Sequence, residues 1–390
     1  MLRFISQNLI VYFNLMISRF RHLYFCAFLV SLILLSQKVS ADNKPVDVVF
    51  CMDLSGSTNG LIDDLRDRMW DIIIQLQSVK PAPNLRIGFV AYSRPSFGKT
   101  TGYVKVVSPL TGDFEQLSFD LFNIRPYIEK GDQLVGAALE MTVKSMNWTR
   151  ESEAVKMIFL IGNGGVQLGS VDFRAACDEA TAKHISIHPI FCTKANKSKE
   201  ITGWLEIARL SGTEMKEIHV HQTVPLDPVC KNIPALKEAN DRLIKSYIYY
   251  GDAGFSKLKL LKISDSNAML AGVLCFEARV NYKLRNLPIQ DHWDLVDYMK
   301  RYGDLPKFDH NTLADTLRMI PDDNLKRTVL KAKDLRVKAL IDINNLLPPD
   351  RQDQIKKQLV EKNLEKAETL EIIVVEAYFK MLKSKGFVIY

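Results

Sequence analysis

The sequence lacks the short motifs that mark common enzyme classes. Its 390 residues contain no Gly-x-Ser-x-Gly nucleophile motif, no His-Glu-x-x-His zinc motif and no glycine-rich phosphate-binding loop. Internal repeats, low-complexity tracts and Cys-x-x-Cys pairs are also missing. These absences argue against serine hydrolases, zinc proteases and nucleotide-binding enzymes, and the sequence predicts a protein without enzymatic activity.

Cysteine is scarce, with six residues in the whole chain. Cys26 falls in an apolar N-terminal segment, which leaves five, an odd number that cannot all pair within one chain. Cys51 and Cys192 lie in apolar segments that we predict to be strands, where an unpaired cysteine packs as a small apolar residue. A Cys230–Cys275 disulfide is compatible with an exported protein, but no feature of the sequence requires it.

The chain has little excess charge once its N-terminus is set aside. The formal net charge is +7, and residues 1–41 contribute four basic side chains and no acidic one, namely Arg3, Arg19, Arg21 and Lys38. The remainder therefore carries +3, the difference between these two values. No run of lysine and arginine interleaved with aromatics is present. We therefore expect no nucleic-acid partner.

The N-terminal segment has the pattern of a secretory signal. Leu23–Leu35 is an apolar run that follows basic residues and precedes Val39-Ser40-Ala41, a small-x-small cleavage sequence. The run is shorter than the roughly 20 residues that a membrane-spanning helix needs. We predict a signal peptide over residues 1–41, cleaved before Asp42, and a secreted or periplasmic protein of the cell envelope. The alternative is an uncleaved signal, which would attach the chain to a membrane.

The rest of the chain shows two different secondary-structure patterns. From Val46 to Ile218, apolar strand-like segments alternate with helical segments, for example 61–77, 85–92, 134–146, 155–161 and 201–210. This alternation predicts an α/β domain over residues 42–222, with a Rossmann-like, doubly wound and mainly parallel sheet. After the proline-containing stretch 224–228, helical patterns dominate. We predict an all-α C-terminal domain over residues 223–390.

Three long helical patterns fill most of the C-terminal region. They cover residues 257–287, 323–346 and 352–383, with prolines at 288, 348 and 349 marking their ends. In the last of them, apolar residues at helical spacing (Ile372, Val375, Ala377 and Met381) predict a stripe that packs in the core of a helical bundle.

The stretch VDVVFCMDLSGS, residues 46–57, carries the clearest functional signal. Its apolar part predicts a strand buried on both faces, which ends at Asp53. Ser55 and Ser57 then alternate with Asp53 in the turn that precedes a helix. Ligands bind at this end of the strands in open α/β sheets. One carboxylate and two hydroxyls suit a hard cation such as Mg²⁺, with positions left for water or a partner's carboxylate.

Asp-x-Ser-x-Ser in this setting resembles the metal-ion-dependent adhesion site of von Willebrand factor type A domains. Further stretches strengthen the resemblance: LRIGFVAY (85–92), KGDQLVGAAL (130–139), NW (147–148), KMIFLIGNGG (156–165), GWLEIARLSG (203–212), SYIYYG (246–251) and HWDLVD (292–297). In this order they are similar to a family of exported bacterial proteins that join this domain to a helical C-terminal region. The resemblance covers nearly all of the chain after residue 41.

The resemblance implies which other residues complete the metal site. Two later loops supply ligands in the family, usually a threonine and an aspartate. It places Asp132 at the threonine position and Asn163 at the position of the last acid. Asn163 removes a negative charge that Asp132 restores. The implied site is then Asp53, Ser55, Ser57, Asp132 and Asn163, holding Mg²⁺, or Mn²⁺ or Ca²⁺, and completed by an Asp or Glu of a protein ligand, as in cell adhesion.

Two other functions stay open from the sequence. The chain could be a metal-independent scaffold or assembly protein of the cell envelope, in which the loop residues only hydrogen-bond the turn and the helical region makes the contacts. It could also be a metal-dependent hydrolase that uses the same cation as a Lewis acid. The hydrolase is the weaker hypothesis, because no residue of the sequence can be named as the general base that it needs.

Overall fold

The computed structural model of the chain describes residues 43–58, 60–125, 127–193, 199–220, 226–361 and 369–389. Residues 44–390 form one structural unit, and the predicted signal peptide lies outside the described residues. The strands are β1 (Pro45–Asp53), β2 (Val79–Lys80), β3 (Asn84–Tyr92), β4 (Val104–Thr111), β5 (Val155–Gly162), β6 (Ser186–Thr193), β7 (Lys216–His219) and β8 (Val388–Ile389).

Six of these strands form the central sheet, in the order β4-β3-β1-β5-β6-β7. All neighbours are parallel except β3 and β4, which are antiparallel. The sheet is therefore mixed and mainly parallel, which confirms the predicted fold class. Asp53 pairs with Tyr92 of β3, and Met52 pairs with Ile161 of β5. This register brings the loops that follow β1 and β5 together at one edge of the sheet.

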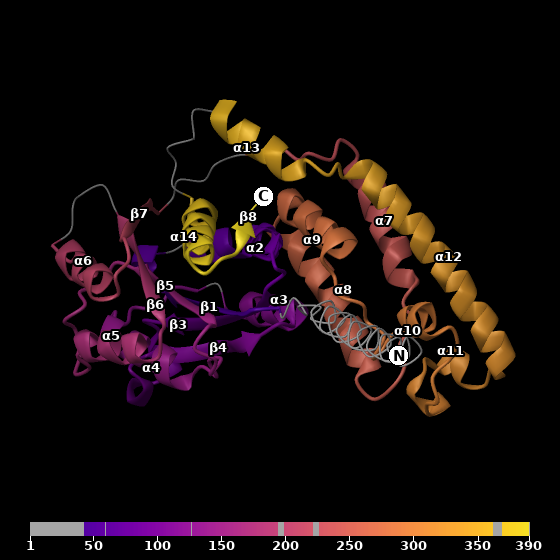
Figure 1. Ribbon diagram of the computed structural model, residues 1–390, viewed down its shortest axis with the longest axis horizontal. Coiled ribbons are helices and arrows are strands. Elements are labelled where there is room, and N and C mark those ends of the chain that lie inside the picture. Colours follow the sequence, from indigo (N-terminus) through magenta and orange to yellow (C-terminus); the bar gives the residue numbers. More distant parts are fainter. Residues whose placement is uncertain are drawn as a thin grey trace, which may run out of the picture. The chain divides into compact units, whose positions relative to one another are not determined.

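Helices cover both faces of the sheet because alternate residues of β1 point in opposite directions. Val48, Phe50 and Met52 belong to a core with α2 (Leu61–Gln77), α3 (Phe114–Phe122) and α14 (Leu370–Ser384). Val49 and Cys51 belong to the opposite core, with α4 (Val135–Ser145), α5 (Phe173–Ala182) and α6 (Ile201–Leu210). Figure 1 shows α4 and α5 on one side of the sheet and α2 and α14 on the other.

The rest of the helical region follows β7. Its helices are α7 (Ile233–Lys245), α8 (Gly254–Ala271), α9 (Val273–Arg285), α10 (Leu295–Tyr302), the short α11 (Asp315–Arg318), α12 (Asp322–Leu346) and α13 (Arg351–Glu361). The single helix predicted over 257–287 is wrong. Gly272 has φ +147°, outside the helical range, and it separates α8 from α9.

The last helix does not pack as the sequence suggested. Ile373, Val374 and Tyr378 of α14, which the predicted stripe does not include, lie in the core that β1 and α2 share, and Ala377 and Met381 of the stripe pack against this core. The partner of α14 is therefore the α/β domain and not a helical bundle. The helical region also ends in a strand, β8, which pairs with β2 beside the central sheet. Among the described residues, no helix has the length and apolar character needed to cross a membrane.

Buried ion pairs connect the helical region to α2 and α3. Arg351, 1% exposed, lies 2.5 Å from an Asp71 carboxylate oxygen. Arg279 of α9 is fully buried, lies over the ring of Trp70 and pairs with Glu115 of α3 at 2.8 Å. A buried guanidinium group without its carboxylate partner would lower stability strongly. These pairs therefore favour one arrangement of the helices on the α/β domain.

Candidate metal centre

Asp53 is the deepest residue of the candidate site. It ends β1, a strand buried on both faces, and its side chain is fully buried. One carboxylate oxygen, Oδ1, accepts a hydrogen bond from the backbone N–H of Ser55 at 2.8 Å. The sequence Asp-x-Ser favours this local turn, because an aspartate readily accepts from the backbone two residues on. The second oxygen, Oδ2, is thereby left to face the loops.

Ser55 precedes a short 3-10 turn, Gly56–Thr58, and Ser57 lies within it. Thr58 closes this turn, since its hydroxyl donates to the backbone oxygens of Asp53 and Ser55 at 2.8 and 3.1 Å. The hydroxyl oxygens of Ser55 and Ser57 are consequently 2.8 Å apart. The turn thus directs both hydroxyls toward the same point as the Asp53 carboxylate.

Asn163 enters from the loop after β5. Its Oδ1 accepts a hydrogen bond from the Ser57 hydroxyl at 2.8 Å, and its Nδ2 donates to the backbone oxygen of Cys192 at 3.1 Å. The bond to Cys192 determines the orientation of the amide, because only Nδ2 can donate to a carbonyl. The oxygen of Asn163 therefore faces the cluster.

Gln133 comes from the loop that precedes α4, and its side chain lies among the other four residues. Its Nε2 is 2.6 Å from Asp53 Oδ2, 2.9 Å from Ser55 Oγ, 2.8 Å from Ser57 Oγ and 2.9 Å from Asn163 Oδ1. Four oxygens from two loops thus surround one atom of a third loop. We call these five side chains, Asp53, Ser55, Ser57, Gln133 and Asn163, the loop cluster.

Asp132 lies outside the loop cluster. Its side chain is exposed and lines a neighbouring cavity with Tyr103 and Leu134. Residues 131–134 have no helical or strand structure, and the backbone N–H groups of Leu134 and Val135 donate to the carbonyl oxygens of Asp132 and Gln133 at 3.1 and 3.0 Å. The chain turns tightly at these residues, so the two adjacent side chains point in different directions. Gln133 therefore faces the cluster, and Asp132 as a metal ligand stays a prediction.

A close backbone approach makes room for Gln133. A Cβ atom on Gly164 would lie 2.3 Å from Gln133 Cβ and 3.1 Å from its Oε1. No side chain fits there, so the glycine after Asn163 is part of the site. The sequence shows a Gly162-Asn163-Gly164-Gly165 loop, but it gives no sign of which side chain the loop admits.

The loop cluster contains one acidic side chain, that of Asp53. Burial raises the pKa of the Asp53 carboxyl above its ordinary value, against hydrogen bonds from Ser55, Ser93 and Gln133 that lower it. Among the described residues no group of three or more His, Cys, Asp or Glu side chains could hold a metal ion. The cluster instead offers one carboxylate, two hydroxyls and one amide oxygen.

This donor set fits a hard divalent cation. All four donors are oxygens, and they converge on one point, the place of Gln133 Nε2, to within 2.6 to 2.9 Å. Mg²⁺ and Ca²⁺ bind oxygen ligands, at about 2.1 Å and about 2.3 to 2.6 Å, which is closer than these hydrogen-bond distances. Asp53, Ser55, Ser57 and Asn163 are therefore the residues that would hold such an ion.

The cysteines take no part in a site of this kind. The five cysteines of the described part, Cys51, Cys177, Cys192, Cys230 and Cys275, are all buried and free. Burial raises the pKa of the Cys51 thiol to about 12, so it stays protonated. Cys230 and Cys275 do not form the disulfide that the sequence permitted.

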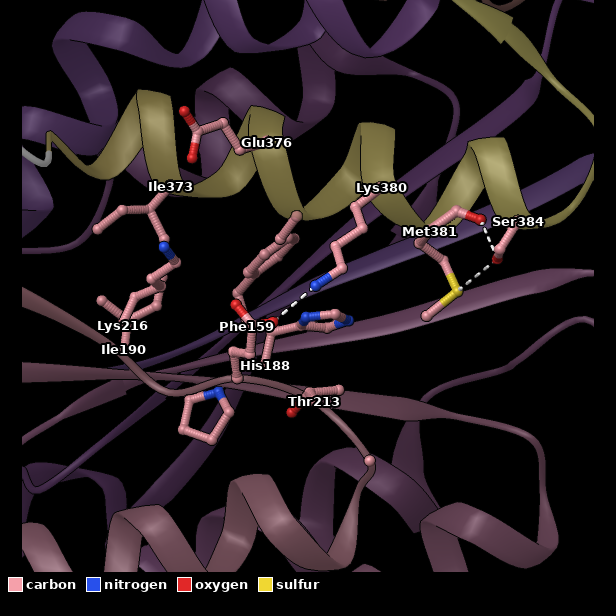
Figure 2. A pocket seen from close by; sticks show the side chains of 14 residues that line it. Phe159, His188, Ile190, Thr213, Lys216, Ile373, Glu376, Lys380, Met381 and Ser384 are labelled. Atoms are coloured by element: carbon pink, nitrogen blue, oxygen red, sulfur yellow. Dashed lines mark hydrogen bonds and ion pairs between the residues drawn. The ribbon is translucent and has the colours of Figure 1, made fainter.

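A separate cavity of about 450 Å³ lies between α14 and the strands β5 to β7. Figure 2 shows Phe159 and His188 on its strand side and Lys380 reaching in from α14, where it pairs with Glu214 at 2.7 Å. Burial, and then the charge of Lys380, lower the pKa of His188 to about 4. The lining contains both basic and acidic side chains, so the cavity favours neither anionic nor cationic ligands.

Comparisons with known proteins agree with the architecture. The family model of the von Willebrand factor type A domain matches residues 47–206. No curated protein matches the chain. Among solved structures, proximal thread matrix protein 1 from the mussel byssus, with a zinc-occupied MIDAS motif, is 14% identical over 47% of this chain and 44% of its own, at a TM-score of 0.35.

Two further solved structures are similar at the same level. The pilus adhesin SpaC from Lactobacillus rhamnosus GG is 13% identical over 45% of this chain and 28% of its own, at a TM-score of 0.34. An aerotolerance-related membrane protein from Bacteroides fragilis is 17% identical over 45% of this chain and 91% of its own, at 0.31. The chain thus spans less than half of the mussel protein and of the adhesin. Likenesses this distant carry no argument about function.

Proposed function

Residues 47–206 are a von Willebrand factor type A domain, followed by a helical C-terminal region, and on this premise we propose that the chain is a non-enzymatic binding protein. Such domains generally bind protein ligands. In the proposed function, a divalent cation at the loop cluster joins the domain to a carboxylate of its ligand. Mg²⁺ is the ion that we propose, with Mn²⁺ or Ca²⁺ as the alternatives.

One observation carries this proposal. The oxygens of Asp53, Ser55, Ser57 and Asn163 come from different loops and converge on one point at the carboxyl edge of the sheet. Because three of the four donors are neutral, an ion held there keeps most of its charge. It would attract an Asp or Glu side chain of a protein ligand strongly.

The same geometry argues against Ser55 as a nucleophile. Its hydroxyl bonds the Ser57 hydroxyl and the Gln133 amide, and neither is a base at neutral pH. The carboxylate of Asp53 would be a ligand of the cation, so it would not be free to act as the base that a serine nucleophile needs. The proposed role requires binding alone. The leader pattern of residues 1–41 supports a proposed location in the cell envelope or outside the cell.

Calorimetric titration tests the proposal. We expect Mg²⁺ and Mn²⁺ to bind the full chain at one site, and Asp53→Ala to abolish this binding, because it removes the carboxylate of the cluster. Asp178→Ala, which removes an exposed aspartate of α5, is the control and should bind like the wild type. A partial loss on Asp132→Ala would place that carboxylate near the ion, as the resemblance implies.

The outcome that contradicts the proposal is equally specific. If the wild type takes up no ion at millimolar concentrations, or if Asp53→Ala binds equally well, the loop cluster is not the cation site. A metal-independent scaffold is then the better function. The observation that favours this second candidate is that the five side chains of the loop cluster already hydrogen-bond one another.

A further inference from the structure

The atom at the centre of the loop cluster is a nitrogen of the chain itself. Gln133 Nε2 has four oxygens within 2.9 Å, but an amide nitrogen carries only two hydrogens. A primary amide on a protein surface does not need four acceptors. Such a surplus of oxygens around one point is the environment of a cation.

We propose that Gln133 is an internal occupant of the cation position, which competes with the ion and so determines the affinity of the site. This inference rests on the proposed function, since it concerns the same four oxygens. It assigns a role to a residue that neither the motif nor the spacing of the ligands singles out.

The chemistry of the neighbours determines which end of the amide faces inward. If the Gln133 amide were turned over, Oε1 would lie where Nε2 is, 2.6 Å from Asp53 Oδ2. Two oxygens without a proton between them repel. With Nε2 inward, the buried carboxylate of Asp53 receives a hydrogen bond instead. Without an ion, therefore, the nitrogen end belongs in the cluster, and this end cannot bind a cation.

The backbone of Gln133 is held while its side chain can turn. Gly131 approaches Ser93 so closely that a Cβ atom on it would lie 2.5 Å from the Ser93 backbone oxygen, and Gly164 packs against Gln133 Cβ. The side-chain torsions beyond Cβ are not fixed by these contacts. An entering ion thus requires a rotation of the amide away from the cluster, not a rearrangement of the loop.

Removing the amide should therefore strengthen ion binding. Gln133→Ala abolishes the hydrogen bonds that the ion must displace, of which the bond to the Asp53 carboxylate is charge-assisted. We expect the Mn²⁺ affinity to rise by about 10- to 100-fold, given the usual strength of such bonds. Gln133→Asn, which shortens the side chain by one methylene, should act in the same direction and serves if the alanine variant folds poorly.

The experiment combines calorimetry with thermal unfolding of the full chain. Mn²⁺ is titrated into the wild type, Gln133→Ala and the control Gln116→Ala, whose amide donates to Asp120 on the surface of α3 at 2.8 Å. The melting temperature of each protein is measured with EDTA and with saturating Mn²⁺. We expect Gln133→Ala to melt below the wild type in EDTA, and to gain more from Mn²⁺ than either other protein.

The two readouts separate this inference from the proposed function. Tighter Mn²⁺ binding by Gln133→Ala supports both. If no variant binds Mn²⁺, the proposed function is overturned and the competition with it. If the wild type binds Mn²⁺ and Gln133→Ala binds it equally or more weakly, or if Gln133→Ala melts in EDTA at the temperature of Gln116→Ala, the inference alone is overturned and the proposed function stands.

Discussion

Replacing Asn163 by aspartate would give the loop cluster a second carboxylate. Asp53 Oδ2 and Asn163 Oδ1 lie 2.6 and 2.9 Å from the same atom, Gln133 Nε2, so they are at most about 5.5 Å apart, the sum of the two distances. At an effective dielectric constant of about 20, two unit charges at this separation repel each other by about 3 kcal/mol. The variant also loses the hydrogen bond to the Cys192 carbonyl, worth about 1 kcal/mol.

Two opposite effects follow from this second charge. Without metal, Asn163→Asp should lower the free energy of unfolding at pH 7 by about 4 kcal/mol, the two terms together. With metal, both carboxylates attract the ion, so the Mn²⁺ affinity should rise by about 100-fold, which corresponds to about 3 kcal/mol. The variant is thus the weaker protein in EDTA and the tighter metal binder.

Urea unfolding in EDTA and in Mn²⁺, together with calorimetry, measures both effects. Asn311→Asp, an exchange of the same kind at an exposed position, is the control and should change neither quantity. The reasoning is refuted if Asn163→Asp is as stable as the wild type in EDTA, or if its affinity for Mn²⁺ does not increase. Either result would mean that position 163 does not face the cation.

Two further predictions concern the helical region. Arg351→Ala strands the buried carboxylates of Asp71 and Glu277 and should lower the free energy of unfolding by about 3 to 5 kcal/mol in urea, whereas Arg318→Ala, which removes a surface pair, should cost about 1 kcal/mol or less. Burial raises the pKa of Glu371 from 4.5 to about 7, so its contribution to stability is complete below pH 4.5 and is lost as the pH rises through 7. Glu371→Gln cannot ionise and should therefore be more stable, relative to the wild type, at pH 8 than at pH 5 by about 1 to 3 kcal/mol in urea unfolding; an equal difference at both pH values would contradict this.

The regular elements of the α/β domain could be predicted because their signals are local. The helix Leu61–Gln77 has the predicted bounds, since its buried residues recur at helical spacing. The strand Val104–Thr111 is harder to predict in full, because its second half contains polar residues and a proline, which its pairing with β3 at the edge of the sheet tolerates. The bend at Gly272 could not be predicted, because an isolated glycine also occurs inside straight helices.

Which surface a segment packs against depends on residues that are distant in the sequence. The prediction for the last helix was wrong for this reason. The stripe of α14 shows that one face is apolar, but the same pattern suits a helical bundle or a sheet. The structure places Tyr378 of this helix against α2, where its hydroxyl donates to the backbone oxygen of Leu76 at 2.8 Å. Whether the helix packs on a bundle or on a sheet depends on where the rest of the chain places it.

The residues of the site were likewise predictable only in part. Asp53, Ser55 and Ser57 follow from a strand that ends in a turn. Asn163 was implied only by the resemblance, and the structure places it after β5, the parallel neighbour of β1. The third loop has no periodicity, so the sequence cannot tell which of two adjacent side chains turns inward. The resemblance points to Asp132, and the structure brings Gln133 into the cluster.

A crystal structure of the full chain grown with Mn²⁺, with anomalous scattering recorded near the manganese edge, tests the central claim most directly. The account predicts one strong anomalous peak among the oxygens of Asp53, Ser55, Ser57 and Asn163, with the Gln133 amide nitrogen turned away from it. The absence of a peak there, with Nε2 still bonded to the Asp53 carboxylate at millimolar Mn²⁺, would contradict the claim that these loops hold a cation.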